Sequence, residues 1–142
     1  MMPTLRTWLL MALLAFNVPV AHSEIAVVVA LDSPLQQLSP RQLSDIYLGR
    51  AKANLGERLL VLDHPRESAL RERFFKNLNG MDLSLVNAYW ARLQFSGETQ
   101  PPIELKNSQT VLETLRGNRL AIGYVEMTSI DRSVRTLLTL KE

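Results

Sequence analysis

The sequence of 142 residues predicts a single small α/β domain, built as a three-layer α/β sandwich around a largely parallel sheet. Short apolar runs typical of strands alternate with segments of helical period, and no period of 20 to 50 residues repeats. Apolar side chains make up 46% of the chain and charged ones 21%, which is close to the globular average. There is no cysteine, so the fold must rest on apolar packing.

The N-terminus has the pattern of a signal peptide. Arg6 is its only charge, and the apolar run from Trp8 to Phe16 is shorter than the roughly 20 residues that a membrane span needs. Ala21-His22-Ser23 places small residues at the two positions that a signal peptidase reads. We expect residues 1–23 to be removed on export to the periplasm and residues 24–142 to form the domain. An uncleaved anchor or an ordinary first helix is the alternative.

The first strand and helix follow directly. Ile25 to Leu31 is a continuous apolar run rich in valine, which predicts a strand covered on both faces in the middle of a sheet. Ser39 is a good N-cap and Pro40 a good first helical residue, and Gly49 can end the helix. The apolar positions of this helix are Leu43, Ile46 and Tyr47.

A second strand is expected at 58–62, followed by a helix from about Arg66 to the stop at Gly80. Asp82 is the predicted cap of a third helix, which should form a hairpin with the second. The apolar positions of these two helices are Leu70, Phe74, Leu78, Val86, Tyr89, Trp90 and Leu93.

The last third of the chain opens with a long loop at 96–102, since it contains one glycine and two prolines. An edge strand at 103–105 comes next. Ser108 is the predicted cap of a fourth helix that stops at Gly117. Two final strands are expected at 120–125 and 134–140.

One apolar core is expected to collect residues from all of these elements. Tyr89, Trp90 and Phe95 could line a ligand cleft, but aromatic residues at helical spacing are more often part of the core. The predicted core residues are Leu43, Ile46, Phe74, Trp90, Leu115 and Ile122.

Composition excludes several classes of function. Sixteen Lys and Arg against fourteen Asp and Glu give a net charge of +2, too small for a nucleic-acid-coating protein. Once the leader is removed, His64 is the only histidine, so a two-histidine metal site cannot form. No G-x-S-x-G motif is present. We expect no enzymatic activity, no metal and no cofactor, and His64 could simply be a turn residue.

The segment from Asp63 to Ala69 is the best candidate for a ligand site. A strand ends there and a helix opens near Ser68, where unpaired amides and the helix dipole favour an anion. Arg66 and Arg71 could add charge-assisted hydrogen bonds to an oxyanion. In the alternative interpretation, Ser68 or Glu67 only caps the helix and the arginines are solvated.

Several segments together resemble the phosphate-type periplasmic substrate-binding proteins of ABC transporters. The stretch from Leu38 to Arg50 resembles their L-(S/T)-x-x-x-L-x-x-I-(F/Y)-x-G-(K/R) segment. The run from Ile25 to Ala30 precedes it. The remaining similar stretches, typical of short single-lobe members, are Ser68 followed by Arg71-Glu72 and Phe74, then Ala88-Tyr89-Trp90, Phe95-Ser96-Gly97, Pro101-Pro102 and Ala121-Ile122-Gly123-Tyr124-Val125.

This resemblance implies one lobe of a type 2 periplasmic binding protein that contacts phosphate or a related oxyanion and works with a membrane transporter or sensor. The ligand loop of the family, roughly R-x-D-G-S-G-T, keeps only its serine here. The candidate anion ligands are Ser68, Ala69, Arg66, Arg71 and His64. Family members bind phosphate between two lobes, so one lobe predicts weak binding unless a second chain pairs with it. The alternative is a lobe without ligand that serves protein interaction or sensory input.

Overall fold

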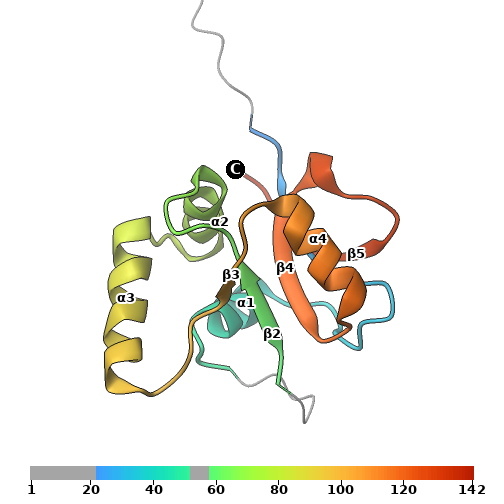
Figure 1. The fold of residues 1–142 in the computed structure, drawn as a ribbon. Helices are drawn as coiled ribbons and strands as arrows, with labels where there is room; N and C mark the ends of the chain where they lie inside the picture. The colour runs from blue at the N-terminus through green and yellow to red at the C-terminus, as the bar shows by residue number, and fades with distance from the viewer. Residues whose placement is uncertain (1–21, 52–57) are drawn as a thin grey trace, which may run out of the picture.

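A five-stranded sheet with strand order β3-β2-β4-β1-β5 forms the centre of the molecule. The computed structural model describes residues 22–51 and 58–142 (Figure 1). The strands are β1 (Ile25–Ala30), β2 (Leu60–Asp63), β3 (Ile103–Glu104), β4 (Ala121–Glu126) and β5 (Val134–Leu140). The helices are α1 (Pro40–Tyr47), α2 (Ala69–Asn79), α3 (Leu83–Ser96) and α4 (Ser108–Gly117), and a 3-10 turn covers Met127–Ser129.

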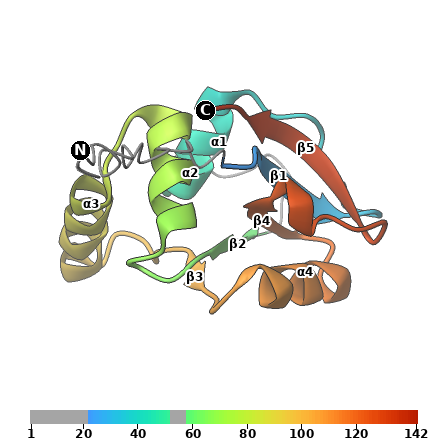
Figure 2. The same cartoon turned by 90° about the horizontal axis from the view of Figure 1, so that it is seen from above.

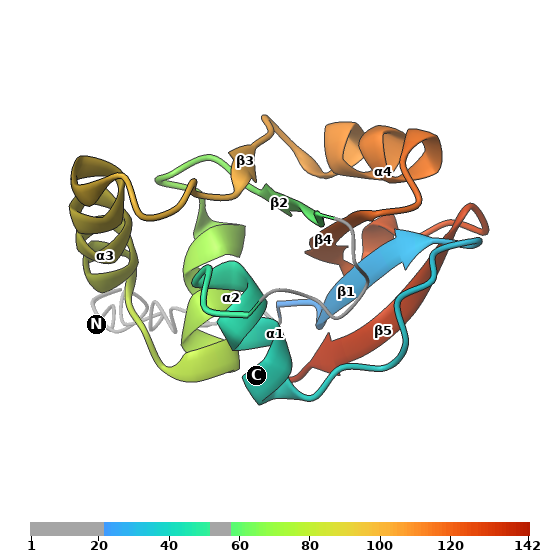
Figure 3. The same cartoon turned by 90° about the horizontal axis from the view of Figure 1, so that it is seen from below.

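The helices cover both faces of the sheet and confirm the three-layer α/β sandwich. Figures 2 and 3 show α4 on one face, with α1 and α2 on the other and α3 beside α2, farther from the sheet. Two apolar clusters fill the spaces between the layers, and β1 contributes to both of them. Its odd-numbered residues face α1 and α2, and Ala26 and Val28 face α4.

The directions of the strands correct one expectation, because the sheet is mixed rather than largely parallel. β2 is parallel to β3 and β4, but β1 is antiparallel to β4 and β5. All six residues of β1 are buried, as expected for an interior strand. An apolar run predicts burial on both faces whether the strand is parallel or antiparallel to its neighbours. Strand direction depends on the chain connections, which the pattern of β1 does not encode.

The helix ends follow local side-chain chemistry. Ser39 and Gln42 form a reciprocal capping box at α1, and Gly49 after its end has a φ of 67°. Ser68 and Asp82 cap α2 and α3. At α4 the expected cap was wrong: Asn107 accepts from the Thr110 amide, and Ser108 is already the first helical residue. Both residue types cap well, so the sequence alone did not choose between neighbours.

The core differs from the expected single cluster at two residues. Leu115 lies in the α4 cluster on the opposite face from Leu43, Phe74 and Trp90, because a three-layer fold has two apolar layers. Phe95 is 97% exposed, whereas Trp90 on the same helix is 5% exposed. Helical spacing places one side of α3 inward, and Phe95 lies outside that side.

Truncation of Trp90 should therefore destabilise the protein strongly. We expect Trp90→Ala to lower the free energy of unfolding by about 3 to 5 kcal/mol, because the ring is buried in the apolar cluster that contains Leu43 and Phe74. Phe95→Ala on the same helix is the matched control and should change it by less than about 0.5 kcal/mol. Denaturant unfolding measures both. A loss below about 1 kcal/mol for Trp90→Ala would contradict the packing described here.

Candidate functional site

The candidate site lies where β2 ends and α2 begins. Asp63 is the last residue of β2, and Ser68 caps α2 after a short turn closed by the Ser68 amide and the Pro65 carbonyl at 2.8 Å. The parallel neighbour β3 ends at the same edge, with Glu104 in register with Asp63. Helix α3 completes the site from the side, through Asn87 and Gln94. Ligands of open α/β sheets commonly bind at such an edge.

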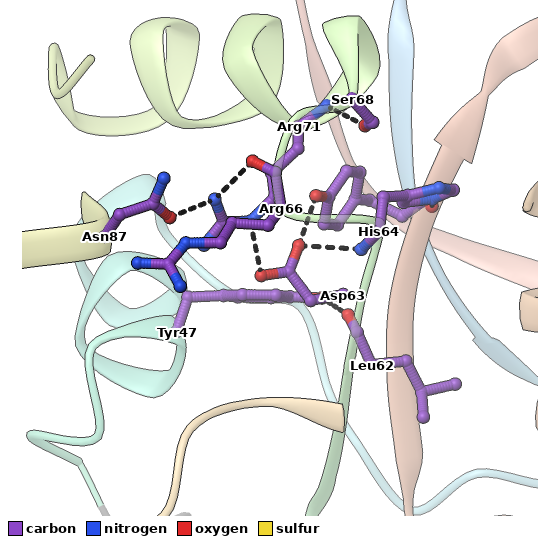
Figure 4. A network of polar contacts seen from close by, with 9 residues as sticks. Tyr47, Leu62, Asp63, His64, Arg66, Ser68, Arg71 and Asn87 are labelled. Atoms are coloured by element: carbon purple, nitrogen blue, oxygen red, sulfur yellow. Dashed lines mark hydrogen bonds and ion pairs between the residues drawn. The ribbon is translucent and has the colours of Figure 1, made fainter. Parts of the chain in front are cut away.

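A buried ion pair occupies the centre of the site (Figure 4). Arg71 Nε lies 2.9 Å from Asp63 Oδ2, and the two side chains are 7% and 6% exposed. Arg71 Nη1 donates to Asn87 Oδ1 at 2.8 Å and to the Arg66 carbonyl at 3.2 Å. Asp63 Oδ1 accepts from the His64 amide and from the Tyr124 hydroxyl. Arg71 is thus neutralised by the protein itself.

The two tyrosines nearest to Asp63 are neutral. Burial raises the pKa of Tyr47 and of Tyr124 well above 10.0, and the negative charge of Asp63 raises both further. The Tyr47 hydroxyl donates to the Leu62 carbonyl at 2.8 Å. Both phenols therefore remain protonated near neutral pH and act as hydrogen-bond donors.

His64 is buried rather than being an exposed turn residue. It is 4% exposed, and its Nε2 lies 2.8 Å from the Tyr124 carbonyl. Burial lowers its pKa from 6.5, although the Tyr124 carbonyl and Asp63 partly oppose this. The ring is therefore neutral at pH 7, with Nε2 donating to the carbonyl. His64 cannot supply a positive charge for an anion there.

The start of α2 retains free hydrogen-bond donors. Ser68 Oγ accepts from the Arg71 amide at 3.0 Å, as a capping residue does, and its own hydroxyl proton remains available. Within the described residues, the amides of Ala69 and Leu70 have no acceptor. Arg66 is exposed and makes no ion pair with any described residue.

The structure therefore divides the expected ligands into two groups. His64, Arg66 and Arg71 line one pocket of about 300 Å³, whereas Ser68 and Ala69 lie outside its lining. Figure 4 shows the Ser68 hydroxyl and Asn87 on opposite sides of Arg71. Of these five residues, only Arg66 is charged and makes no ion pair with a described residue. The alternative in which both arginines are solvated is right for Arg66 and wrong for Arg71.

Sequence reasoning missed the α3 side of this pocket. Asn87, Ala91 and Gln94 line it and are spaced i, i+4 and i+7 on one side of α3. That spacing is a signal of one shared face. Nothing local, however, indicates that this face turns toward the β2–α2 junction, because Asn87 meets Arg71 across a separation of 16 residues. The other lining residues that were missed are Trp90, Pro101, Pro102 and Glu104.

Two further observations concern metals and membranes. In the ranges 22–51 and 58–142, no three His, Asp or Glu side chains gather closely enough to hold a metal ion. In the same part of the chain, the helices are too short or too polar to cross a bilayer.

Comparison with known proteins supports the fold. The structure is similar to an ABC-type phosphate transport receptor from Vibrio cholerae, with a TM-score of 0.63 and 17% identity over 81% of this chain and 45% of that one. It is also similar to a putative phosphate ABC transporter substrate-binding protein with bound phosphate from Clostridium perfringens, with a TM-score of 0.65 and 22% identity over 82% of this chain and 45% of that one. A third similar structure is PstS from Borrelia burgdorferi, with a TM-score of 0.61 and 14% identity over 82% of this chain and 47% of that one.

The expected resemblance is thus confirmed at the level of the fold. The chain has the fold of one lobe of these phosphate receptors and spans less than half of their length. No protein-family model and no curated protein matches the sequence.

Proposed function

We propose that this protein is a non-enzymatic solute-binding module that contacts phosphate or a related oxyanion, weakly as a monomer. The observation that carries the proposal is the start of α2, where the amides of Ala69 and Leu70 have no acceptor among the described residues and the exposed Arg66 comes two residues before the Ser68 cap. Receptors for phosphate transport share the fold, and one of them was solved with phosphate bound.

The chemistry of this helix start suits an oxyanion. The first amides of a helix point outward, and the helix dipole adds a partial positive charge. The Ser68 hydroxyl and the Arg66 guanidinium supply further donors. Arg71 and His64 contribute indirectly, because their bonds to Asp63 and to the Tyr124 carbonyl hold the loop in place.

Two features limit the affinity. A ligand on a single lobe keeps one side in water, where its contacts are screened. Two carboxylates are also close by, since Glu67 precedes Ser68 and Glu72 lies in the first turn of α2. Binding should therefore be much weaker than in a site closed from both sides.

Titration calorimetry with phosphate tests the proposal. We expect the monomer to bind no tighter than about 0.1 to 1 mM, and binding should weaken as salt is raised. The double variant Arg66→Ala with Ser68→Ala should abolish binding, because it removes the free charge and the hydroxyl. Arg41→Ala, an exposed arginine on α1, is the control and should leave binding unchanged.

Two results would overturn this account. Micromolar binding by a proven monomer would contradict the argument that one lobe binds weakly. A melting temperature unaffected by millimolar phosphate, sulfate and molybdate would rule out the oxyanion, because a ligand of the native state must raise it.

The second candidate is a lobe without ligand that serves protein interaction or sensory input. Exposed apolar side chains on α3 favour it, since Phe95 is 97% and Leu85 56% exposed. A membrane transporter, a sensor protein or a second copy of the chain are the partners that this class implies. A melting temperature that no oxyanion raises would favour this second candidate over the first.

We further propose export to the periplasm after cleavage behind Ser23. Residues 1–21 lie outside the described part, so the leader itself stays a prediction from the sequence. The first strand begins at Ile25, and Glu24 is held through its carbonyl by the Met127 amide at 2.8 Å. A cut after Ser23 therefore leaves the five strands complete, and it removes two contacts of Ser23: the one from Arg73 to its carbonyl and the one from its hydroxyl to the Glu24 carbonyl.

Intact-mass measurement on periplasmic material should give a chain that starts at Glu24. A start upstream of Asn17, or recovery only with membranes, would refute the export proposal.

A further inference from the structure

The pocket beside α3 has the size and chemistry to hold more than a phosphate ion. We propose that it receives the organic part of a phosphate monoester, derived from a small polyol or amino alcohol, while Arg66 holds the phosphate at the rim. The inference rests on the proposed oxyanion function and names the class of ligand for it. Arg66 joins the two regions, because it lines the pocket and precedes Ser68 by two residues.

The volume of the pocket is the first argument. It measures about 300 Å³, roughly ten times the share of one water molecule in the liquid and at the lower end for small-molecule pockets. A single tetrahedral oxyanion at Arg66 would leave most of this space to water. A ligand with a short carbon skeleton would fill it.

The second argument is the spacing of two amide side chains on α3. Asn87 and Gln94 both line the pocket and are seven residues apart, which is about 10 Å along a helix. Asn87 Oδ1 is occupied by Arg71, so its NH2 group is the part left for a ligand. The Gln94 amide is exposed and makes no hydrogen bond to a described side chain or main chain. One phosphate ion cannot reach both amides.

The third argument is the pattern of charge. Asp63 and Arg71 neutralise each other, so Arg66 and Glu104 provide the uncompensated charges of the lining. Glu104 lies on β3 in register with Asp63 and pairs with no described cation. A carboxylate attracts an ammonium or hydroxyl donor and repels a second anion. Pro101, Pro102 and Trp90 offer apolar surface to a carbon skeleton.

The test compares four ligands by titration calorimetry on the full mature chain. We expect glycerol 3-phosphate and phosphoethanolamine to bind at least about tenfold tighter than inorganic phosphate. We expect 3-phosphoglycerate, which adds a carboxylate, to bind no tighter than phosphate, because Glu104 repels it.

Variants connect the gain in affinity to the pocket. Gln94→Ala should reduce the advantage of glycerol 3-phosphate over phosphate to less than about threefold and leave phosphate binding unchanged. Glu104→Gln should raise the affinity for 3-phosphoglycerate at least about threefold. Gln109→Ala on α4, on the other face of the sheet, is the matched control and should change neither ligand.

The outcomes separate this inference from the function beneath it. If the esters bind no better than phosphate, or if Gln94→Ala weakens both equally, the inference is overturned and the oxyanion function stands. If neither phosphate nor any ester binds, both are overturned.

Discussion

The buried ion pair of Asp63 and Arg71 is the interaction on which the candidate site depends, because its hydrogen bonds join four elements of the fold. Asp63 ends β2, Arg71 lies in the first turn of α2, Tyr124 comes from β4 and Asn87 from α3. Removing two charges from water costs several kcal/mol per ion, and only close, hydrogen-bonded geometry offsets that cost. Here the carboxylate accepts three hydrogen bonds and the guanidinium donates three, so the loop between β2 and α2 is held from both ends.

This pair also decides what the site can do. Sequence reasoning counted Arg71 as a charge for an oxyanion, but Asp63 already neutralises it. His64 is neutral because it is buried. The donors without a partner among the described residues are therefore Arg66, the Ser68 hydroxyl, the first amides of α2 and the NH2 group of Asn87. A site with one exposed arginine and nearby carboxylates should bind an oxyanion only weakly. Contacts between the neighbouring pocket and an organic group on the ligand would strengthen that binding.

The elements that were predictable depend on neighbours along the chain. Ser39 and Asp82 cap their helices as expected, and Ser68 caps α2 as the alternative interpretation had it, because capping involves residues two or three positions away. The burial of β1 on both faces was also predictable, because the signal is a run of consecutive apolar residues. Strand direction, the burial of Arg71 and the contribution of Asn87 depend on contacts between distant segments. A single sequence holds no direct signal of contacts between distant segments. The exposure of Phe95 was missed for this reason, because it depends on which side of α3 packs against the rest of the fold.

The most direct test of this account is a double-mutant cycle on the pair. Asp63→Ala, Arg71→Ala and the double variant would be compared by denaturant unfolding near neutral pH. Each single change should cost roughly 3 to 5 kcal/mol, because it leaves a buried charge without its partner. The double change should cost clearly less than the sum of the two single changes. Additive losses, or single losses below about 1 kcal/mol, would contradict the claim that Arg71 is committed to Asp63 and not to a ligand.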